Sequence, residues 1–227
     1  MGYLIYFVLI MVIPLWAQMR VKGTFSKYAE VPTNNRITGY EAARRILDEH
    51  GLYKVDIELI DGFLSDHYDP RGKVLRLSQE SYYGTSIAGV AVAAHEVGHA
   101  IQDALAYVPL RMRHALVPIA NIGSNLSWIF ILGGFFLHLM QAALIGVILF
   151  AAAVLFQLVT LPVEFNASHR AMVQLQTLGI IQSNEKRQAR KVLSAAALTY
   201  VAAALVAMLE LLRFVLMLVG MNNRDDR

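Results

Sequence analysis

The sequence of 227 residues contains no cysteine and is poor in charge, since Asp, Glu, Lys and Arg together make up only 16% of it. The absence of cysteine excludes a disulfide-stabilised scaffold, a zinc site with thiolate ligands and a cysteine nucleophile. The 56% share of hydrophobic residues and the 16% share of charged residues argue against an ordinary soluble domain. Such a domain has roughly 45–50% apolar and about 25% charged residues. A net charge of +3 is too small to favour nucleic acid as a partner. The composition therefore indicates a membrane protein.

Four apolar runs are long enough to cross the hydrocarbon core of a bilayer, which takes about 20 residues. They cover residues 2–19, 115–140, 141–163 and 195–220. The first run lacks a preceding basic residue and a small-residue cleavage site, so we expect a retained anchor, kinked at Pro14, rather than a signal peptide. The second and third runs adjoin each other and predict a transmembrane hairpin. Glu210 and Arg213 interrupt the fourth run, where we interpret them as a structural pair or an interfacial arginine.

The segment 20–114 is polar and holds 12 basic and 12 acidic residues, which are most of the acidic residues of the chain. A capping box at Thr38 and Glu41 predicts the start of a helix, and Gly51 predicts its end. Periodicity predicts helices over 40–50 and 86–105 and strands over 55–60 and 74–77. The fold class expected is thus a mainly α membrane protein with four transmembrane helices and a small α+β domain.

Basic residues gather after the first run, before the second, and between the third and fourth, whereas the hairpin tip near residue 140 has neither Lys nor Arg. The positive-inside rule then places the α+β domain 20–114 and the segment 164–194 on the cytoplasmic side of the cell membrane.

His95, Glu96 and His99 form the strongest chemical signal, the pattern His-Glu-Val-Gly-His. Positions i and i+4 lie on one face of a helix, so the two imidazoles can bind one Zn²⁺ ion, and the intervening glutamate can take a proton from a water molecule that the metal activates. The alternative is a pair of surface histidines. Leu105 occupies the position of the third histidine of a metzincin, which excludes that class.

A catalytic zinc site needs a third protein ligand, and Glu164 is the best candidate because it follows the third span on the side of the α+β domain. An interfacial carboxylate is the simpler alternative. Asp103 lies too far along the helix to join both histidines and is at best an orienting partner of His99. Of the other histidines, His67 lies in a loop and could reach a site, and His114 begins the second span. His138 lies at the hairpin tip, on the wrong side of the membrane.

At these residues the chain resembles the YugP-type neutral zinc metallopeptidases, a family of bacterial membrane proteins. The resemblance rests on the segments AHEVGHAIQ at 94–102, LPVEFNAS at 161–168, DHYDP at 66–70 and LSAAALTY at 193–200. More distantly, the chain is similar to the HtpX and CAAX prenyl protease gluzincins, and this implies a gluzincin-like zinc site. Ser168 stands where those relatives have aspartate, so Asn166, Ser168 or Asp103 is expected to orient a metal-binding histidine instead.

Two further features are open between a functional and a structural role. In relatives, a strand such as 74–77 pairs with an extended substrate, but it can equally be an ordinary sheet strand. Donors to a developing oxyanion could come from four residues, each of which is more easily explained as structural: His67, Tyr82, Tyr83 and His169.

We therefore expect a membrane-embedded zinc metalloprotease with His95, His99 and Glu164 as metal ligands and Glu96 as general base. Its cofactor would be Zn²⁺, its surroundings the lipid bilayer, and its substrates membrane proteins or peptides at the inner membrane face. A regulatory membrane partner or an oligomer is compatible with the sequence. The alternatives are a non-catalytic zinc-binding membrane scaffold and a site-2-type intramembrane metalloprotease.

Overall fold

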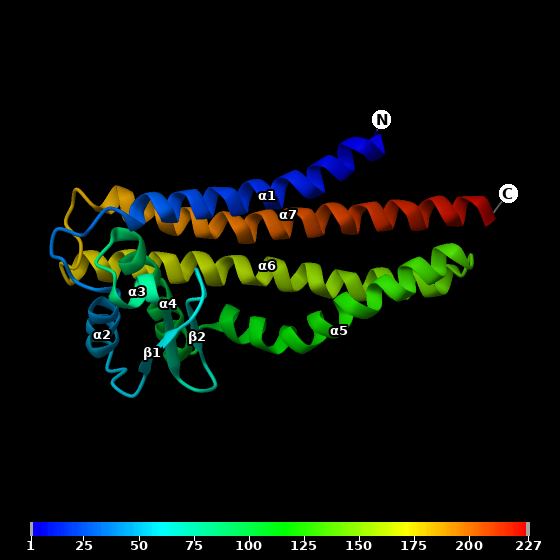
Figure 1. Ribbon diagram of the computed structural model, residues 1–227. Helices are drawn as coiled ribbons and strands as arrows, with labels where there is room; N and C mark the ends of the chain where they lie inside the picture. Colours follow the sequence, from blue (N-terminus) through cyan, green and yellow to red (C-terminus); the bar gives the residue numbers. More distant parts are fainter. Residues whose placement is uncertain (1, 226–227) are drawn as a thin grey trace. The chain divides into compact units, whose positions relative to one another are not determined.

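The computed structural model describes residues 2–225 and is mainly helical, with a small three-stranded sheet (Figure 1). The chain forms two compact units. The first comprises residues 2–15, 111–162 and 200–225 and is called the span unit below. The second comprises residues 16–110 and 163–199 and is called the site unit. Four helices contribute to both units: α1 (Gly2–Ala29), α5 (Val108–Phe136), α6 (Met140–Thr177) and α7 (Lys186–Asp225).

Four helices are long and apolar enough to cross a membrane, which confirms the expected fold class. They are the same four helices, α1, α5, α6 and α7. Each predicted apolar run lies largely within one of them, but α1, α6 and α7 continue well beyond the apolar part. Polar residues that follow an apolar run still favour helix when no breaker intervenes, so a hydropathy boundary is not a helix boundary.

In the span unit, α5 and α6 approach each other closely at small residues. A side chain on Gly146 would lie 2.6 Å from the backbone nitrogen of Ile131, and one on Gly134 would meet the backbone of Ala143. Such small residues let membrane helices pack closely through van der Waals contact. The predicted pairing of these two apolar segments is therefore explained by side-chain size.

In the site unit, the predicted capping box is present at the start of α2 (Gly39–Glu49). The Thr38 hydroxyl accepts a hydrogen bond from the Glu41 amide, and the Glu41 carboxylate accepts one from the Thr38 amide. The hydrogen bonds from Thr38 to the Glu41 carboxylate lower the pKa of that carboxyl below its ordinary value, and the bond from the backbone amide has the largest effect. Gly51 follows the helix with a positive φ of 69°, as expected of a residue that ends a helix.

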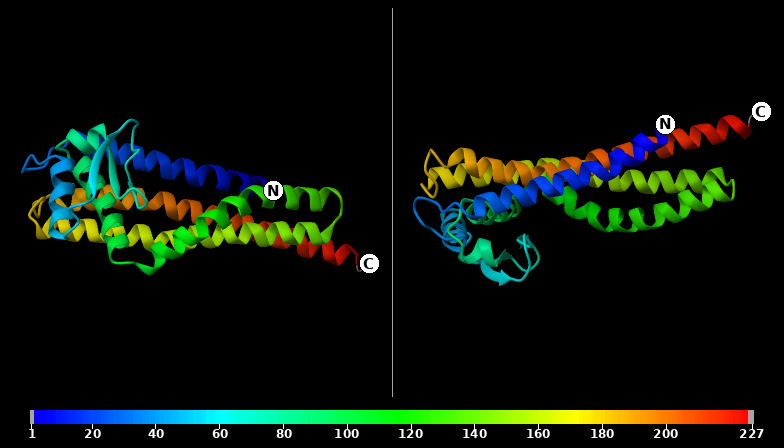
Figure 2. Two further views of the ribbon diagram at one scale, coloured as in Figure 1. Left: turned by 90° about the horizontal axis from the view of Figure 1, so that it is seen from below. Right: turned by 45° about the horizontal axis from the view of Figure 1, so that its top comes forward.

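The strands of the site unit are drawn as arrows in Figure 2. They form one sheet with the order β1-β3-β2. Strand β1 (Asp56–Ile60) is parallel to β3 (Val74–Ser78), and β2 (His67–Asp69) is antiparallel to it. Strands β1 and β3 confirm the two predicted strands, whereas β2 and the short helix α3 (Gln79–Tyr83) were not predicted. Because β3 lies in the middle of the sheet, the idea that its edge receives a substrate strand is wrong.

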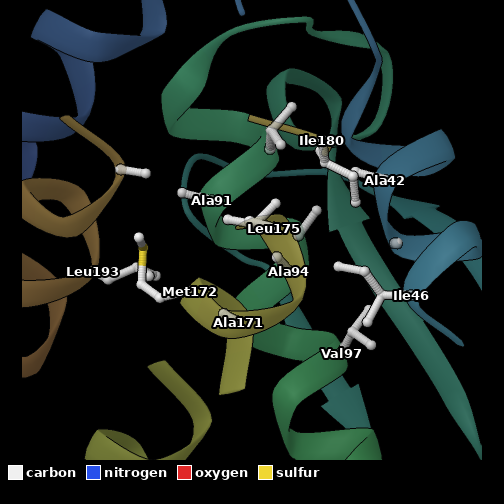
Figure 3. Close-up of a cluster of buried hydrophobic side chains, with 14 of the residues drawn as sticks. Ala42, Ile46, Ala91, Ala94, Val97, Ala171, Met172, Leu175, Ile180 and Leu193 are labelled. Carbon is white, nitrogen blue, oxygen red and sulfur yellow. The ribbon is translucent and has the colours of Figure 1, made fainter. Parts of the chain in front are cut away.

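The core of the site unit joins five helices from distant parts of the chain: α1, α2, α4 (Ile87–Ala104), α6 and α7 (Figure 3). Helix α4 lies against α2, the last turns of α6 and the first turns of α7. The buried side chains are mostly small or aliphatic, and those labelled in Figure 3 are Ala42, Ile46, Ala91, Ala94, Val97, Ala171, Met172, Leu175, Ile180 and Leu193. This core fixes α4 and α6 against each other within the unit.

Candidate metal centre

Helix α4 carries both histidines of the motif on one buried face. Ser86 caps the helix, because its hydroxyl accepts a hydrogen bond from the Gly89 amide. The rings of His95 and His99 lie with their centroids 4.8 Å apart and nearly perpendicular, at 89°. The helical repeat thus turns the i, i+4 spacing into two imidazoles that face one point.

Glu164 approaches the same point from α6. Its Oε2 atom lies 3.3 Å from Nε2 of His95 and 3.6 Å from Nε2 of His99. One ligand atom from each residue lies within 4.8 Å of the others. Zinc–ligand bonds of about 2.0–2.1 Å in a tetrahedral site place neighbouring ligand atoms roughly 3.3–3.4 Å apart. The two distances from the Glu164 oxygen are close to this value, so the three residues could hold a zinc ion. Two imidazoles and one carboxylate are also a ligand set of catalytic zinc sites.

The close approach of α4 to α6 depends on Gly98. A Cβ atom at this position would lie 2.6 Å from the carbonyl oxygen of Ala167 and 3.1 Å from its Cα atom. Because the obstructing atoms belong to the backbone, they cannot move aside as a flexible side chain could. Glycine is therefore required for α6 to bring Glu164 to the histidines.

Gln102 forms a hydrogen bond with Nδ1 of His99. Its amide Nε2 donates to the carbonyl of Val163 at 2.8 Å and to Oδ1 of Asn166 at 3.0 Å, so its Oε1 atom faces Nδ1 of His99 at 3.0 Å. An amide oxygen only accepts hydrogen bonds, so Nδ1 of His99 must carry the proton. The opposite nitrogen, Nε2, then presents its lone pair towards Glu164, as a metal ligand must.

Ser168 has the corresponding place beside His95. Its hydroxyl lies 3.1 Å from Nδ1 of His95, one turn of α6 beyond Glu164. Of the three residues considered as replacements for the relatives' aspartate, Ser168 therefore contacts His95. Asn166 is one step removed, because its Oδ1 accepts from Gln102 and from Nε of Arg170.

Asp103 does not contact His99, so its expected role as an orienting partner of that histidine is wrong. Its carboxylate accepts a hydrogen bond from the Tyr68 hydroxyl at 2.8 Å and forms an ion pair with Lys73. It thus ties α4 to the segment around β2. The sequence could have indicated Gln102 instead, because position i+3 from His99 lies on the same helix face as position i+4.

Glu96 projects beside the two histidines and accepts a hydrogen bond from the backbone amide of Tyr68, at 3.1 Å from its Oε2. Burial raises the pKa of its carboxyl above the ordinary value. A carboxyl group whose pKa is raised towards neutrality is better suited to exchange protons during a reaction than an exposed one. Tyr68 belongs to the unpredicted strand β2, which explains why this contact was not expected.

The other candidate residues lie away from this cluster or have other contacts. The imidazole of His67 is exposed and contacts the Ser65 carbonyl. Tyr82 packs on Tyr40 and Tyr83 in an aromatic group, which favours the structural interpretation of both tyrosines. His114 and His138 belong to the span unit, and His169 is exposed on α6.

Residues 3–219 match the family model described as "Putative neutral zinc metallopeptidase". The chain belongs to this family. It is also 52% identical, over 211 residues and 93% of each chain, to the protein of Bacillus subtilis (strain 168) named "Putative membrane protease YugP". No solved structure matches the chain. The resemblance inferred from the motif segments is therefore confirmed at the level of the family.

Proposed function

We propose that this protein is a membrane zinc metalloprotease in which His95, His99 and Glu164 hold Zn²⁺ and Glu96 is the general base. The observation that carries the proposal is the convergence of two Nε2 atoms and one carboxylate oxygen from α4 and α6 at 3.3 and 3.6 Å. Family membership supports the same reaction class, because the family description names a zinc metallopeptidase.

A zinc ion held by these residues would polarise the scissile carbonyl and make a water molecule acidic enough to attack it near neutral pH. Glu96 accepts the proton that this water loses and then donates it to the nitrogen of the departing amine. The hydrogen bond from the Tyr68 amide keeps the Glu96 carboxylate beside the histidines between these two transfers. The two products are a peptide with a new carboxyl end and one with a new amino end.

Gln102 and Ser168 are positioning residues in this mechanism. Each contacts the Nδ1 atom of one histidine and leaves the Nε2 atom directed towards Glu164. Such outer partners set the tautomer and the orientation of a metal-binding imidazole. Gln102 also bonds to the backbone of Val163, next to Glu164, so that one buried side chain orients parts of both helices.

We infer that substrates are membrane proteins or peptides near the inner face of the membrane. The site unit is covalently continuous with apolar helices at α1, α5, α6 and α7, so its site is held near the bilayer. Strand β2 is an edge strand, and its Tyr68 amide is directed at Glu96 rather than at β3. An extended substrate backbone can therefore lie along β2 as an additional strand beside the catalytic glutamate.

The test compares cells that express the wild type with cells that express Glu96→Gln, with Glu49→Gln as a matched control on the exposed surface of the site unit. Labelling of new amino ends in the membrane fraction should reveal peptides that the wild type and the control produce and the Glu96→Gln variant does not. The purified Glu96→Gln protein should retain zinc by elemental analysis, because the amide replaces a base and not a ligand.

Two outcomes would favour other functions. Identical amino ends with all three proteins, together with bound zinc, would support the non-catalytic scaffold. The intramembrane alternative needs the metal motif inside a span, but α4 is not among the four candidate spans found in residues 2–225. It would regain support only if residues of α4 were protected by lipid in a labelling experiment.

We further propose that the site unit faces the cytoplasm and that the segments 20–114 and 164–194 lie on that side. The chain lacks cysteine, so single cysteines can be introduced cleanly. Lys54→Cys and Ser183→Cys should react with a membrane-impermeant maleimide only after the membrane is opened. Gln141→Cys, near the hairpin tip, should react in intact cells. Labelling of positions 54 and 183 from opposite sides would contradict the arrangement that brings Glu164 to the histidines.

A further inference from the structure

A groove of about 520 Å³ in the site unit is lined by the last turns of α1 and the first turns of α7. The two helices are labelled in Figure 1. We call this groove the α1–α7 groove. Its basic lining residues are Arg20, Lys27, Arg187, Arg190 and Lys191, and its other lining residues include Thr24, Tyr28, Ser194, Met19, Ala195 and Leu198. The volume lies in the range of about 300–1,000 Å³ that is typical of small-molecule sites. The groove is separate from the candidate metal centre, with which it shares no residue.

The charge of the groove is uncompensated. Five cations line it, and none of the acidic side chains in residues 4–220 does. Within the described chain, no ion pair or hydrogen bond is formed by any of the five, although Arg44 and Arg76 elsewhere in the same unit pair with carboxylates. The acidic Glu185 precedes α7, but its two oxygens accept backbone amides of Asn34 and Gln182. Like charges held together repel one another, and a bound anion would relieve that repulsion.

The groove also has an apolar part, and this narrows the choice of anion. Met19 precedes Arg20 on α1, and Ala195 and Leu198 follow Lys191 on α7. Both helices therefore change from apolar to basic along the groove, as helices do where they leave the hydrocarbon for the headgroup region of a membrane. A free phosphate ion would use only the basic part, whereas a phospholipid offers an anionic headgroup to the cations and acyl chain to the apolar walls.

We propose that the α1–α7 groove binds the phosphate-bearing headgroup of an anionic phospholipid. Basic side chains at the membrane surface attract anionic lipids, and basic pockets between membrane helices hold their headgroups. The bound lipid would join the two helices that border the groove. Phe25 and Tyr28 of α1, and Val192 and Leu193 of α7, belong to the apolar cluster that also contains the end of α6. Lipid binding would thus stabilise the fold of the site unit.

The experiment uses the full-length, delipidated protein in a neutral detergent, titrated with phosphatidylglycerol and with zwitterionic phosphatidylcholine, with bound lipid counted by native mass spectrometry. The test variant Lys27→Gln/Lys191→Gln removes one cation from each wall of the groove. The control variant Lys22→Gln/Lys186→Gln removes the same charge from the same two helices, at residues that do not line the groove.

We expect the wild type and the control to bind phosphatidylglycerol in preference to phosphatidylcholine. The affinity of the test variant should fall by about fivefold for each cation removed. Equal losses of phosphatidylglycerol affinity in the test and control variants would show only general attraction to the basic surface and would overturn the proposal. Equal binding of phosphatidylglycerol and phosphatidylcholine by the wild type would overturn it too. Should the double variant unfold at a lower temperature than the control, Lys191→Gln alone is used, and an unchanged affinity would contradict the site.

Two competitors identify the source of the anion. Inorganic phosphate should displace labelled phosphatidylglycerol only poorly, because it lacks the acyl chains that contact the apolar walls. Displacement by phosphate, or by a soluble Glu-rich peptide, as effective as displacement by unlabelled phosphatidylglycerol would overturn the lipid assignment. In the first case the groove would bind free phosphate, and in the second it would bind an acidic protein segment.

Discussion

The span unit and the site unit differ in the partners to which their buried hydroxyl and amide side chains form hydrogen bonds. In the span unit, hydroxyls bond to carbonyls of their own helix, as Thr160 does to Phe156 at 2.8 Å and Ser127 to Ser124 at 2.9 Å. In the site unit, polar side chains bond to residues far along the chain, as Gln102 does to Val163. A helix in lipid must satisfy its polar groups within the protein, and its nearest partners are its own carbonyls. The site unit instead uses polar bonds to position chemistry.

The cores of the two units differ in the size of their apolar clusters and in the polar residues that they bury. The span unit has a small cluster in which the rings of Trp128, Phe150 and Phe214 pack edge to face, and many of its large apolar side chains face outwards. The site unit buries its aliphatic residues around α4 and includes fully buried Gln102 and Glu164. Lipid removes the driving force to bury every apolar side chain, whereas water imposes it.

The largest expected effect tests whether the long-range polar arrangement of the site unit holds a metal. Glu164→Ala should leave two imidazoles as the only protein ligands and lower zinc affinity by more than the roughly 10–100-fold that follows the loss of an outer partner. Zinc content after dialysis against a graded chelator measures this, and Glu49→Ala serves as the control. Retained zinc in Glu164→Ala, with loss of zinc in His67→Ala or Asp103→Ala, would move the third ligand elsewhere.

The next effect concerns the contact that permits this arrangement. Gly98→Ala places a Cβ atom 2.6 Å from the carbonyl oxygen of Ala167, so α4 and α6 must separate. We expect a destabilisation of about 1–3 kcal/mol, typical of overpacking, together with weaker zinc binding. Gly133→Ala in the span unit has no atom within 4 Å of the added Cβ and should not destabilise the protein. Chemical denaturation in detergent compares the two, and equal stabilities would refute the role of Gly98.

A third pair of substitutions contrasts the two kinds of polar bond directly. Gln102→Leu leaves the Nδ1 hydrogen of His99 without its acceptor and removes one donor each from the Val163 carbonyl and Asn166 Oδ1. Stability should therefore fall by about 1–3 kcal/mol and zinc affinity by roughly 10–100-fold. Thr160→Val in the span unit removes only a bond within one helix and should change zinc affinity little. Isothermal titration with zinc measures the zinc affinity of both variants, and chemical denaturation in detergent measures their stability. A larger loss of zinc affinity in Thr160→Val than in Gln102→Leu would contradict the comparison between the units.

Features that depend on neighbouring residues were predicted well. The capping box at Thr38 and Glu41, strands β1 and β3, helix α4 and the four apolar helices follow from spacing, pattern and length over a few turns. The short elements β2 and α3 were missed, because three to five residues carry too little periodicity for a prediction. With β2 missed, the contact of Tyr68 with Glu96 and the central place of β3 could not be foreseen.

By itself, the sequence determined that His95 and His99 share one helix face with Glu96 beside them, because the helical repeat places residues i and i+4 together whatever surrounds them. It also determined which segments are apolar enough to enter a membrane. The contact of Glu164 with the histidines, and of Gln102 rather than Asp103 with His99, depends on the packing of the folded chain. Those contacts join residues more than 60 positions apart or depend on which neighbours surround a side chain. They exist because α4 and α6 pack closely at Gly98, and no local preference of the chain specifies that packing.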